Sequence, residues 1–445
     1  MNLINKSISG IKWTSLSSSL KIILRVIQIY FLTKILSPED FGLIALTMTI
    51  IGFSETFRDF GVSNAIIHKT DISKNQLSTL LFINIFLGII FYLFFYFSAS
   101  FFANVFNSID LKNTLQILSV TFLINSFGTL YGSILKKHLK FKSISIIEII
   151  STFLSFILSI YLAIEGYGIK ALIYPTILSC IILNILYVKE GRTFFRPKIY
   201  FNIGEILFFI RFGLFQMSHN AVSYLGKDLD YIIIGKTLNF EILGIYTLAK
   251  ELAIKPALFL NPIIMKVGFP IMSKVQNNIT QLREAYLKSI RLIGIINIPI
   301  YFLMFISSFH IVNILFGEKW DSSIVIFPIL CFAFTIRSLN SPAGALLLSK
   351  GKADQGFYWS LFEIALTSVV LYLGSQKELL GIAYSIIIIQ LIMFFLHTNF
   401  IVLKILKTSF LNMLHQIFLP ITSCLAFYAI IFFTTGFDNS LNFAI

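Results

Sequence analysis

The sequence has few charged residues and few cysteines, and this shortage excludes several classes of protein. Charged residues make up 13% of the 445 residues, whereas a soluble domain has about 25%. Its cysteines, Cys180, Cys331 and Cys424, lie in apolar runs without metal-ligand spacing, so neither a disulfide framework nor a metal site is expected. The sequence contains no G-x-x-x-x-G-K-S/T nucleotide-binding loop, which argues against direct use of ATP. We therefore expect no cofactor.

Long apolar runs are what the sequence has instead. Hydrophobic residues make up 57% of the chain, and the mean hydropathy is +0.85. Residues 78–109 contain no charged side chain at all. These runs are continuously apolar and do not alternate, so they predict membrane-spanning helices and argue against a β-barrel.

The fold class predicted from these runs is an all-α polytopic membrane protein with 12–13 transmembrane helices. The predicted spans are 12–33, 41–65, 79–103, 114–134, 143–164, 169–188, 207–235, 243–265, 289–309, 322–346, 356–374, 381–402 and 412–434. With the N-terminus in the cytoplasm, nineteen Lys and Arg residues lie on inward segments and six on outward loops. This positive-inside bias predicts a multi-pass protein of a cytoplasmic membrane and accounts for most of the net charge of +14 without nucleic acid. The abundance of Ile, Phe, Asn and Lys is typical of an AT-rich bacterial genome, so we expect the bacterial cytoplasmic membrane.

An internal repeat divides the helices into two groups of six. At an offset of 202 residues Lys34 aligns with Lys236 and Gly42 with Gly244, and a second match at offset 212 pairs Ser126 with Ser338. The predicted domains are an N-terminal six-helix lobe (1–188), a basic cytoplasmic linker (189–204), a C-terminal six-helix lobe (205–402) and an extra C-terminal transmembrane segment (403–445). Parallel repeats of this kind predict a carrier with a V-shaped central cavity and alternating access.

Ionisable residues inside the predicted spans concentrate in the first two helices of each half. Each costs about 2.5–3.5 kcal/mol at the centre of a spanning helix, so such residues normally face a bundle interior or a wet cavity. The offset of 202 also aligns Arg25 with Lys227, which places a cation at an equivalent depth in both lobes. The candidates for binding a diphosphate are the cations Arg25, Arg58, Lys227 and Lys250. The candidates for ion coupling or charge tuning are the acids Glu55, Asp59, Asp230 and Glu251, and those for sugar contacts are Gln216 and Asn220.

The same charges also have a structural interpretation. Glu55 and Arg58 are spaced to form an ion pair within one helix, and so are Lys227 and Asp230. The group as a whole is more basic than such pairing requires. A cationic cavity favours an anionic cargo, because the guanidinium group of arginine suits phosphate oxygens.

Residues 36–69, LSPEDFGLIALTMTIIGFSETFRDFGVSNAIIHK, resemble the opening of bacterial lipid-linked oligosaccharide flippases. The similarity is to the polysaccharide-export branch of the multidrug/oligosaccharidyl-lipid/polysaccharide superfamily, and within it to colanic-acid-exporter-like proteins. It lies in the short turn from Pro38 to Gly42 and in a following helix that ends in Asp59-Phe60-Gly61.

This resemblance implies a cargo and a route. The cargo would be an undecaprenyl-diphosphate-linked oligosaccharide, flipped to the outer leaflet for O-antigen, capsule or exopolysaccharide assembly, with polysaccharide polymerase machinery as a further partner. Because the sequence has no nucleotide-binding loop, we expect a proton or sodium gradient to drive the transport. Related flippases hold the diphosphate with arginines of the first, second and eighth helices, which implies that role for Arg25, Arg58 and Lys250. The chain departs from the pattern, because the eighth-helix cation is lysine and the thirteenth span has no fourteenth partner.

Two other functions fit parts of the sequence. A drug or cation antiporter of the same superfamily would share the fold, but it would favour an acidic or neutral cavity. A membrane glycosyltransferase or polymerase would place Glu39 and Asp40 in the first outer loop, yet this loop is too short to build an acceptor site. We therefore expect a transporter and not an enzyme.

Overall fold

The computed structural model describes residues 3–58, 62–69 and 71–435, and within these ranges it contains helices and no strands. Eleven helical segments in this part of the chain are long and apolar enough to cross a membrane. The predicted fold class, an all-α polytopic membrane protein, is therefore confirmed.

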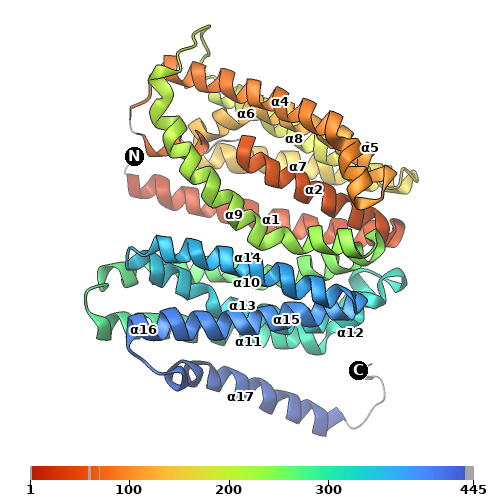
Figure 1. Ribbon diagram of the computed structural model, residues 1–445, viewed down its shortest axis with the longest axis vertical. Helices are drawn as coiled ribbons and strands as arrows, with labels where there is room; N and C mark the ends of the chain where they lie inside the picture. Colours follow the sequence, from red (N-terminus) through yellow and green to blue (C-terminus); the bar gives the residue numbers. More distant parts are fainter. Residues whose placement is uncertain (1–2, 59–61, 70, 436–445) are drawn as a thin grey trace. The chain divides into compact units, whose positions relative to one another are not determined.

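The helices follow one another with short connections (Figure 1). The first part of the chain holds α1 (Leu3–Ile35), α2 (Pro38–Arg58), α3 (Val62–His68), α4 (Lys74–Phe106), α5 (Ile109–Leu118), α6 (Val120–Lys137), α7 (Phe141–Ile164), α8 (Lys170–Gly191), η1 (Gly204–Ile206) and α9 (Leu207–Thr237). The second part holds α10 (Phe240–Lys274), α11 (Ile279–Ile306), α12 (Ser308–Leu315), η2 (Glu318–Trp320), α13 (Ser322–Ser349), α14 (Ala353–Ser375), α15 (Glu378–His397), the π-helical turn η3 (Thr398–Val402), α16 (Leu403–Leu406) and α17 (Phe410–Thr435).

Each predicted span coincides with one helix or with two consecutive helices, as far as it lies in the described residues. The predicted span 114–134 is divided at Ser119, where α5 ends and α6 begins. Two predicted spans, 207–235 and 412–434, are helical but do not belong to the eleven apolar segments. The first is α9, which carries the charged residues Lys227, Asp228 and Asp230. The second is α17, in which the apolar part, Phe410–Ala426, is shorter than the eleven segments.

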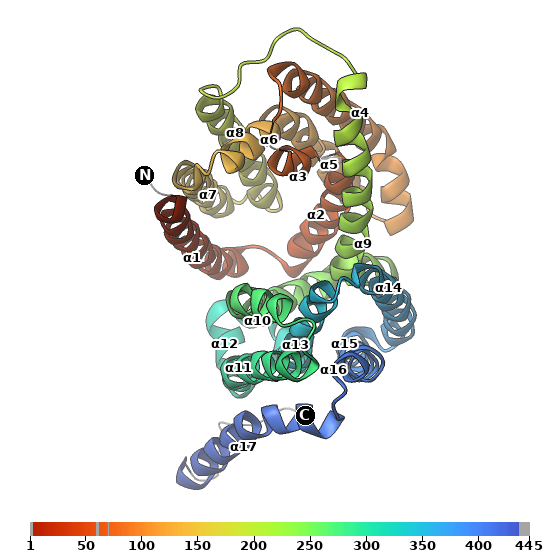
Figure 2. The same ribbon diagram turned by 90° about the vertical axis from the view of Figure 1, so that its left-hand side faces the viewer.

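The first compact unit runs from Met1 to Gly244 and includes α9. Figures 1 and 2 show α1, α7, α8 and α6 as successive neighbours, with α4 packed against α6. α2 packs against α5 and α9. A buried apolar cluster that includes Ala65, Leu80, Leu130 and Tyr187 joins α3, α4, α6 and α8. The two six-helix lobes predicted from the internal repeat, 1–188 and 205–402, divide the chain differently from these compact units, and they stay a prediction.

The second compact unit runs from Ile245 to Ile445. Within it α11 packs against both α13 and α17, and α15 packs against α13 and α14. Its buried apolar cluster includes Met272, Tyr286, Leu346 and Met413, so α10, α11, α13 and α17 share one core.

Proline 175 interrupts the backbone hydrogen bonding of α8 inside the membrane. A proline has no N–H group, so the carbonyl four residues earlier, that of Ala171, loses its helical donor. The hydroxyl of Ser159 on α7 donates to this carbonyl at 2.8 Å. Because lipid supplies no donors, this side chain satisfies a group that would otherwise be buried unbonded.

Proline 342 in α13 likewise leaves a backbone carbonyl without its helical donor in the second unit. The orphaned carbonyl belongs to Ser338, and Nδ2 of Asn261 on α10 donates to it at 3.1 Å. Oδ1 of Asn261 in turn accepts from Nδ2 of Asn297 on α11 at 2.7 Å. Asn261 therefore ties α10 to both α11 and α13.

Two glycines that the repeat aligns, Gly42 and Gly244, lie against each other within the first unit. A Cβ atom on Gly42 would collide with the carbonyl oxygen of Phe240, and a Cβ atom on Gly244 would collide with that of Pro38. Pro38 and Phe240 are also 202 residues apart. Both repeat positions therefore need glycine, because α2 and the first turn of α10 meet backbone to backbone.

Candidate functional site

A chain of buried polar side chains links α2, α6 and α8 in the first unit. Glu55 and Arg58 form an ion pair on α2, with Nε and Nη2 of Arg58 lying 2.8 and 2.6 Å from Oε2 of Glu55. The other carboxylate oxygen, Oε1, accepts from Nδ2 of Asn125 on α6 at 2.9 Å. Oδ1 of Asn125 accepts from Nδ2 of Asn184 on α8 at 2.8 Å. We call these four residues the polar link.

Arg58 is the most deeply buried member of the polar link. Its side chain is 2% exposed, and that of Glu55 is 24% exposed. Among the described residues, Nη1 of Arg58 is buried without a hydrogen-bond partner. Unbonded buried donors are rare because each costs about 1–3 kcal/mol, and more when the group is charged. The guanidinium group thus keeps one donor that an anion would satisfy. The neighbouring candidate Asp59 lies outside the described residues.

The candidate Arg25 lies on α1 beside a second ion pair. Nη1 of Arg25 lies 3.3 Å from Oε1 of Gln28, one turn further along the helix. One turn before Arg25, Nζ of Lys21 lies 2.6 Å from Oε2 of Glu148 on α7, and the side chains are 35% and 28% exposed. Glu148 therefore compensates a cation that has no obvious partner on its own helix.

The candidates on α9 differ in their exposure. Lys227 is exposed, whereas Asp230 is buried at 6%. The two candidates for sugar contacts, Gln216 and Asn220, bond to each other, with Nε2 of Gln216 donating to Oδ1 of Asn220 at 3.1 Å. A sugar hydroxyl would compete with this bond or bridge it.

The remaining candidates lie on α10 in the second unit. Lys250 is 4% exposed, and its Nζ lies 6.0 Å from the centroid of the Tyr246 ring. Glu251 accepts from Nζ of Lys255 at 3.3 Å. Because Lys250 and the other cations lie in different units, their convergence on one diphosphate stays a prediction.

The structure brings the predicted pair Glu55 and Arg58 into direct contact, and it joins the two candidates for sugar contacts, Gln216 and Asn220, to each other. It also adds Asn125 and Asn184, which the sequence reasoning missed. An asparagine in an apolar helix is a detectable signal, because its amide needs partners in the membrane. The sequence alone does not identify the helix that supplies those partners.

Comparison with known proteins places the chain in a family. A family model described as polysaccharide biosynthesis protein matches residues 31–326. The lipopolysaccharide biosynthesis protein WzxC of Escherichia coli K12 is 28% identical, over 94% of this chain and 86% of that protein. The teichuronic acid biosynthesis protein TuaB of Bacillus subtilis 168 is 32% identical, over 87% of this chain and 80% of that protein.

A solved structure shares the fold. The lipid II flippase MurJ in an inward closed conformation matches with a TM-score of 0.74 and 15% identity, covering 94% of this chain and 92% of that one. At this identity the match supports the fold alone. The family match spans more than half of the chain, and it confirms the resemblance first seen in residues 36–69. The chain therefore belongs to the polysaccharide biosynthesis protein family, within the multidrug/oligosaccharidyl-lipid/polysaccharide superfamily.

Proposed function

We propose that this membrane transporter flips an undecaprenyl-diphosphate-linked oligosaccharide from the cytoplasmic to the outer leaflet by alternating access. The observation that carries the proposal is Arg58, a cation buried at the end of the apolar helix α2 with one nitrogen lacking an acceptor. The relatives WzxC and TuaB are named for lipopolysaccharide and teichuronic acid biosynthesis, which favours a polysaccharide precursor as the cargo.

Arg58 would bind the diphosphate through Nη1 while Glu55 holds the rest of the guanidinium group. Because Arg58 is 2% exposed in this structure, the cargo would reach it only after α2 and its neighbours move apart. Arg25, Lys227 and Lys250 would supply the remaining positive charge. Charge-assisted hydrogen bonds to phosphate are about twice as strong as neutral ones, so these cations would favour a diphosphate over a neutral head group.

The acids would tune these cations or carry the coupling ion. Glu55 already balances Arg58, and Asp230 is buried on α9 near the aligned cation Lys227. A proton or sodium gradient would supply the energy, and no cofactor would be required. The N-terminus would lie in the cytoplasm, as the distribution of Lys and Arg predicts.

An apolar groove in the second unit fits a lipid-linked cargo. The groove has a volume of about 450 Å³ and lies among α11, α13, α15 and α17. Its walls include Phe302, Phe332, Leu391, Ile417 and Leu425. A polyprenyl chain would pack along this surface.

The test is rescue of a bacterium that lacks its own O-antigen or exopolysaccharide flippase. Wild-type protein should restore surface polymer, and Arg25→Ala, Arg58→Ala and Lys227→Ala should each reduce it at equal membrane abundance. Purified protein in liposomes with a fluorescent undecaprenyl-diphosphate oligosaccharide gives the same test without dependence on the host's sugar. Full transport by all three variants would overturn the role of the cations. Drug resistance without lipid flipping would favour the antiporter.

A further inference from the structure

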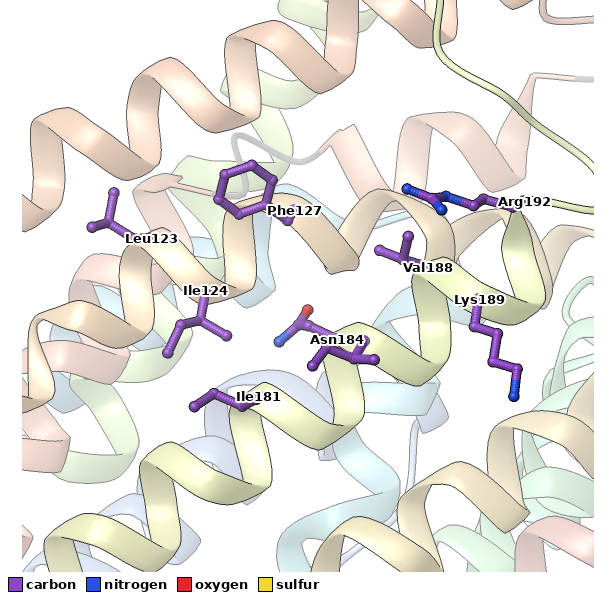
Figure 3. Close-up of a pocket in the computed structure, with 9 residues that line it drawn as sticks. Leu123, Ile124, Phe127, Ile181, Asn184, Val188, Lys189 and Arg192 are labelled. Carbon is purple, nitrogen blue, oxygen red and sulfur yellow. The ribbon is translucent and has the colours of Figure 1, made fainter.

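A second groove lies between α6 and α8 in the first unit, apart from the polar link's ion pair. It has a volume of about 610 Å³ (Figure 3). Its apolar walls are Leu123, Ile124 and Phe127 of α6 and Ile181, Ile185 and Val188 of α8.

This groove opens on the outer side of the helix pair. Asn125 points to Glu55 on α2, and Phe127, two residues further on, lies about 200° around α6 from it. Phe127 and Ile185 are 51% and 61% exposed. In a membrane such a surface contacts lipid chains and not water. The groove is therefore a lipid-facing feature.

One end of the groove is cationic. Lys189 and Arg192 both line it and both are exposed, and Arg192, the C-cap residue of α8, follows Lys189 by three residues. Figure 3 shows both residues at the end of α8 that carries Val188, with the Arg192 side chain directed back above Val188 and the Lys189 side chain directed the other way. The acid between them, Glu190, accepts from the hydroxyl of Ser143 on α7 at 2.9 Å. Its carboxylate is thus bonded to α7, and the groove end keeps a positive charge.

We propose that this groove binds one anionic phospholipid. Its phosphate would bind at this end of the groove, within reach of the long side chains of Lys189 and Arg192, and an acyl chain would run along the apolar walls towards Leu123. Basic pockets between transmembrane helices recognise anionic headgroups in this way. With the predicted topology the lipid belongs to the cytoplasmic leaflet, where the connection after α8 lies. The site is distinct from the cargo site, because it faces away from Glu55 and Arg58.

The residue at the floor of the groove connects lipid binding to the packing of α6 against α8. Asn184 lines the groove, and its Nδ2 donates to Asn125 in the polar link. A lipid that bridges α6 and α8 would hold these two helices together around that bond. Binding to the folded state alone would also raise thermal stability.

The test compares phosphatidylglycerol with phosphatidylcholine of the same acyl chains, bound to the purified full-length protein in neutral detergent. Native mass spectrometry and thermal unfolding provide the two measurements. Wild-type protein should prefer phosphatidylglycerol, and Lys189→Gln/Arg192→Gln should weaken that binding roughly thirtyfold. The matched control Arg196→Gln/Lys198→Gln removes the same two charge types beyond the groove and should keep the preference. Ile185→Trp should weaken both lipids by filling the groove.

Three results would overturn the proposal. The first is an unchanged lipid preference in the Lys189 and Arg192 variant. The second is an equal loss in the Arg196 and Lys198 control, which would indicate attraction to the whole basic surface. The third is displacement of phosphatidylglycerol by undecaprenyl diphosphate with the same dependence on Lys189 and Arg192, which would assign the groove to the cargo.

Discussion

The two units join their helices through buried polar groups of different kinds. In the first unit, the carboxylate of Glu55, which is paired with Arg58 on α2, accepts from Asn125 on α6, and Asn125 accepts from Asn184 on α8. In the second unit, α10, α11 and α13 are joined through two amides, Asn261 and Asn297, and a backbone carbonyl. Neutral amides suffice to fix helix positions in a membrane. The charged version costs more to bury, so its presence in the first unit indicates a task beyond packing.

The sharpest test of this difference is Glu55→Ala. It leaves Arg58 buried with its main acceptor removed, and breaking a buried ion pair in this way costs about 3–5 kcal/mol. Folded yield and thermal stability in detergent should therefore fall steeply. Transport should also be lost.

The double variant Glu55→Leu/Arg58→Met separates stability from function. It replaces both charges with apolar side chains, which is often neutral or stabilising for a buried pair. Stability should recover while polymer export remains absent. Equal instability of the single and double variants would show that the ion pair is not what the single change disrupts.

A smaller effect is expected from Asn261→Ala in the second unit. This change leaves the Ser338 carbonyl and the Asn297 amide without their partner, at about 1–3 kcal/mol. Thermal unfolding in detergent measures the loss. Asn399→Ala is the control, because Asn399 donates to the carbonyl of Phe395 in an exposed position, and it should change stability by at most about 0.5 kcal/mol. A loss from Asn261→Ala as large as that from Glu55→Ala would remove the distinction between the units.

The smallest expected effect is a pH dependence at the loop between α6 and α7. Burial first, and then the charges of Lys137 and Lys140, lower the pKa of His138 from its ordinary value of 6.5. The unfolded chain therefore binds this proton more readily than the folded one, so stability should fall as the pH decreases from 7.5 towards 5. His138→Phe keeps a ring to stack on Phe194 and should flatten the pH dependence of the unfolding temperature. His415→Phe, on α17, should leave it unchanged.

Much of the fold could be predicted from the sequence, because apolar length and loop charge are local properties. Every predicted span is helical in the described residues, and the intrahelical pair Glu55–Arg58 follows from a spacing of three. The contacts between helices could not be predicted in this way. Lys21 and Glu148 are 127 residues apart, and no periodicity in the sequence identifies them as partners. The hydrogen bond between Asn125 and Asn184 could not be predicted for the same reason, since it depends on how α6 packs against α8.

The contact between Gly42 and Gly244 has a consequence for the duplicated sequence. Repeats usually bring redundancy, since a damaged copy leaves the other intact. Here each glycine lies against the stretch that contains the other, with Pro38 and Phe240 in matching places. This is the reciprocal pattern of a two-fold dimer interface, formed within one chain. A side chain added at either glycine pushes apart the same two backbones. An intact glycine in one repeat therefore cannot compensate for a substitution in the other.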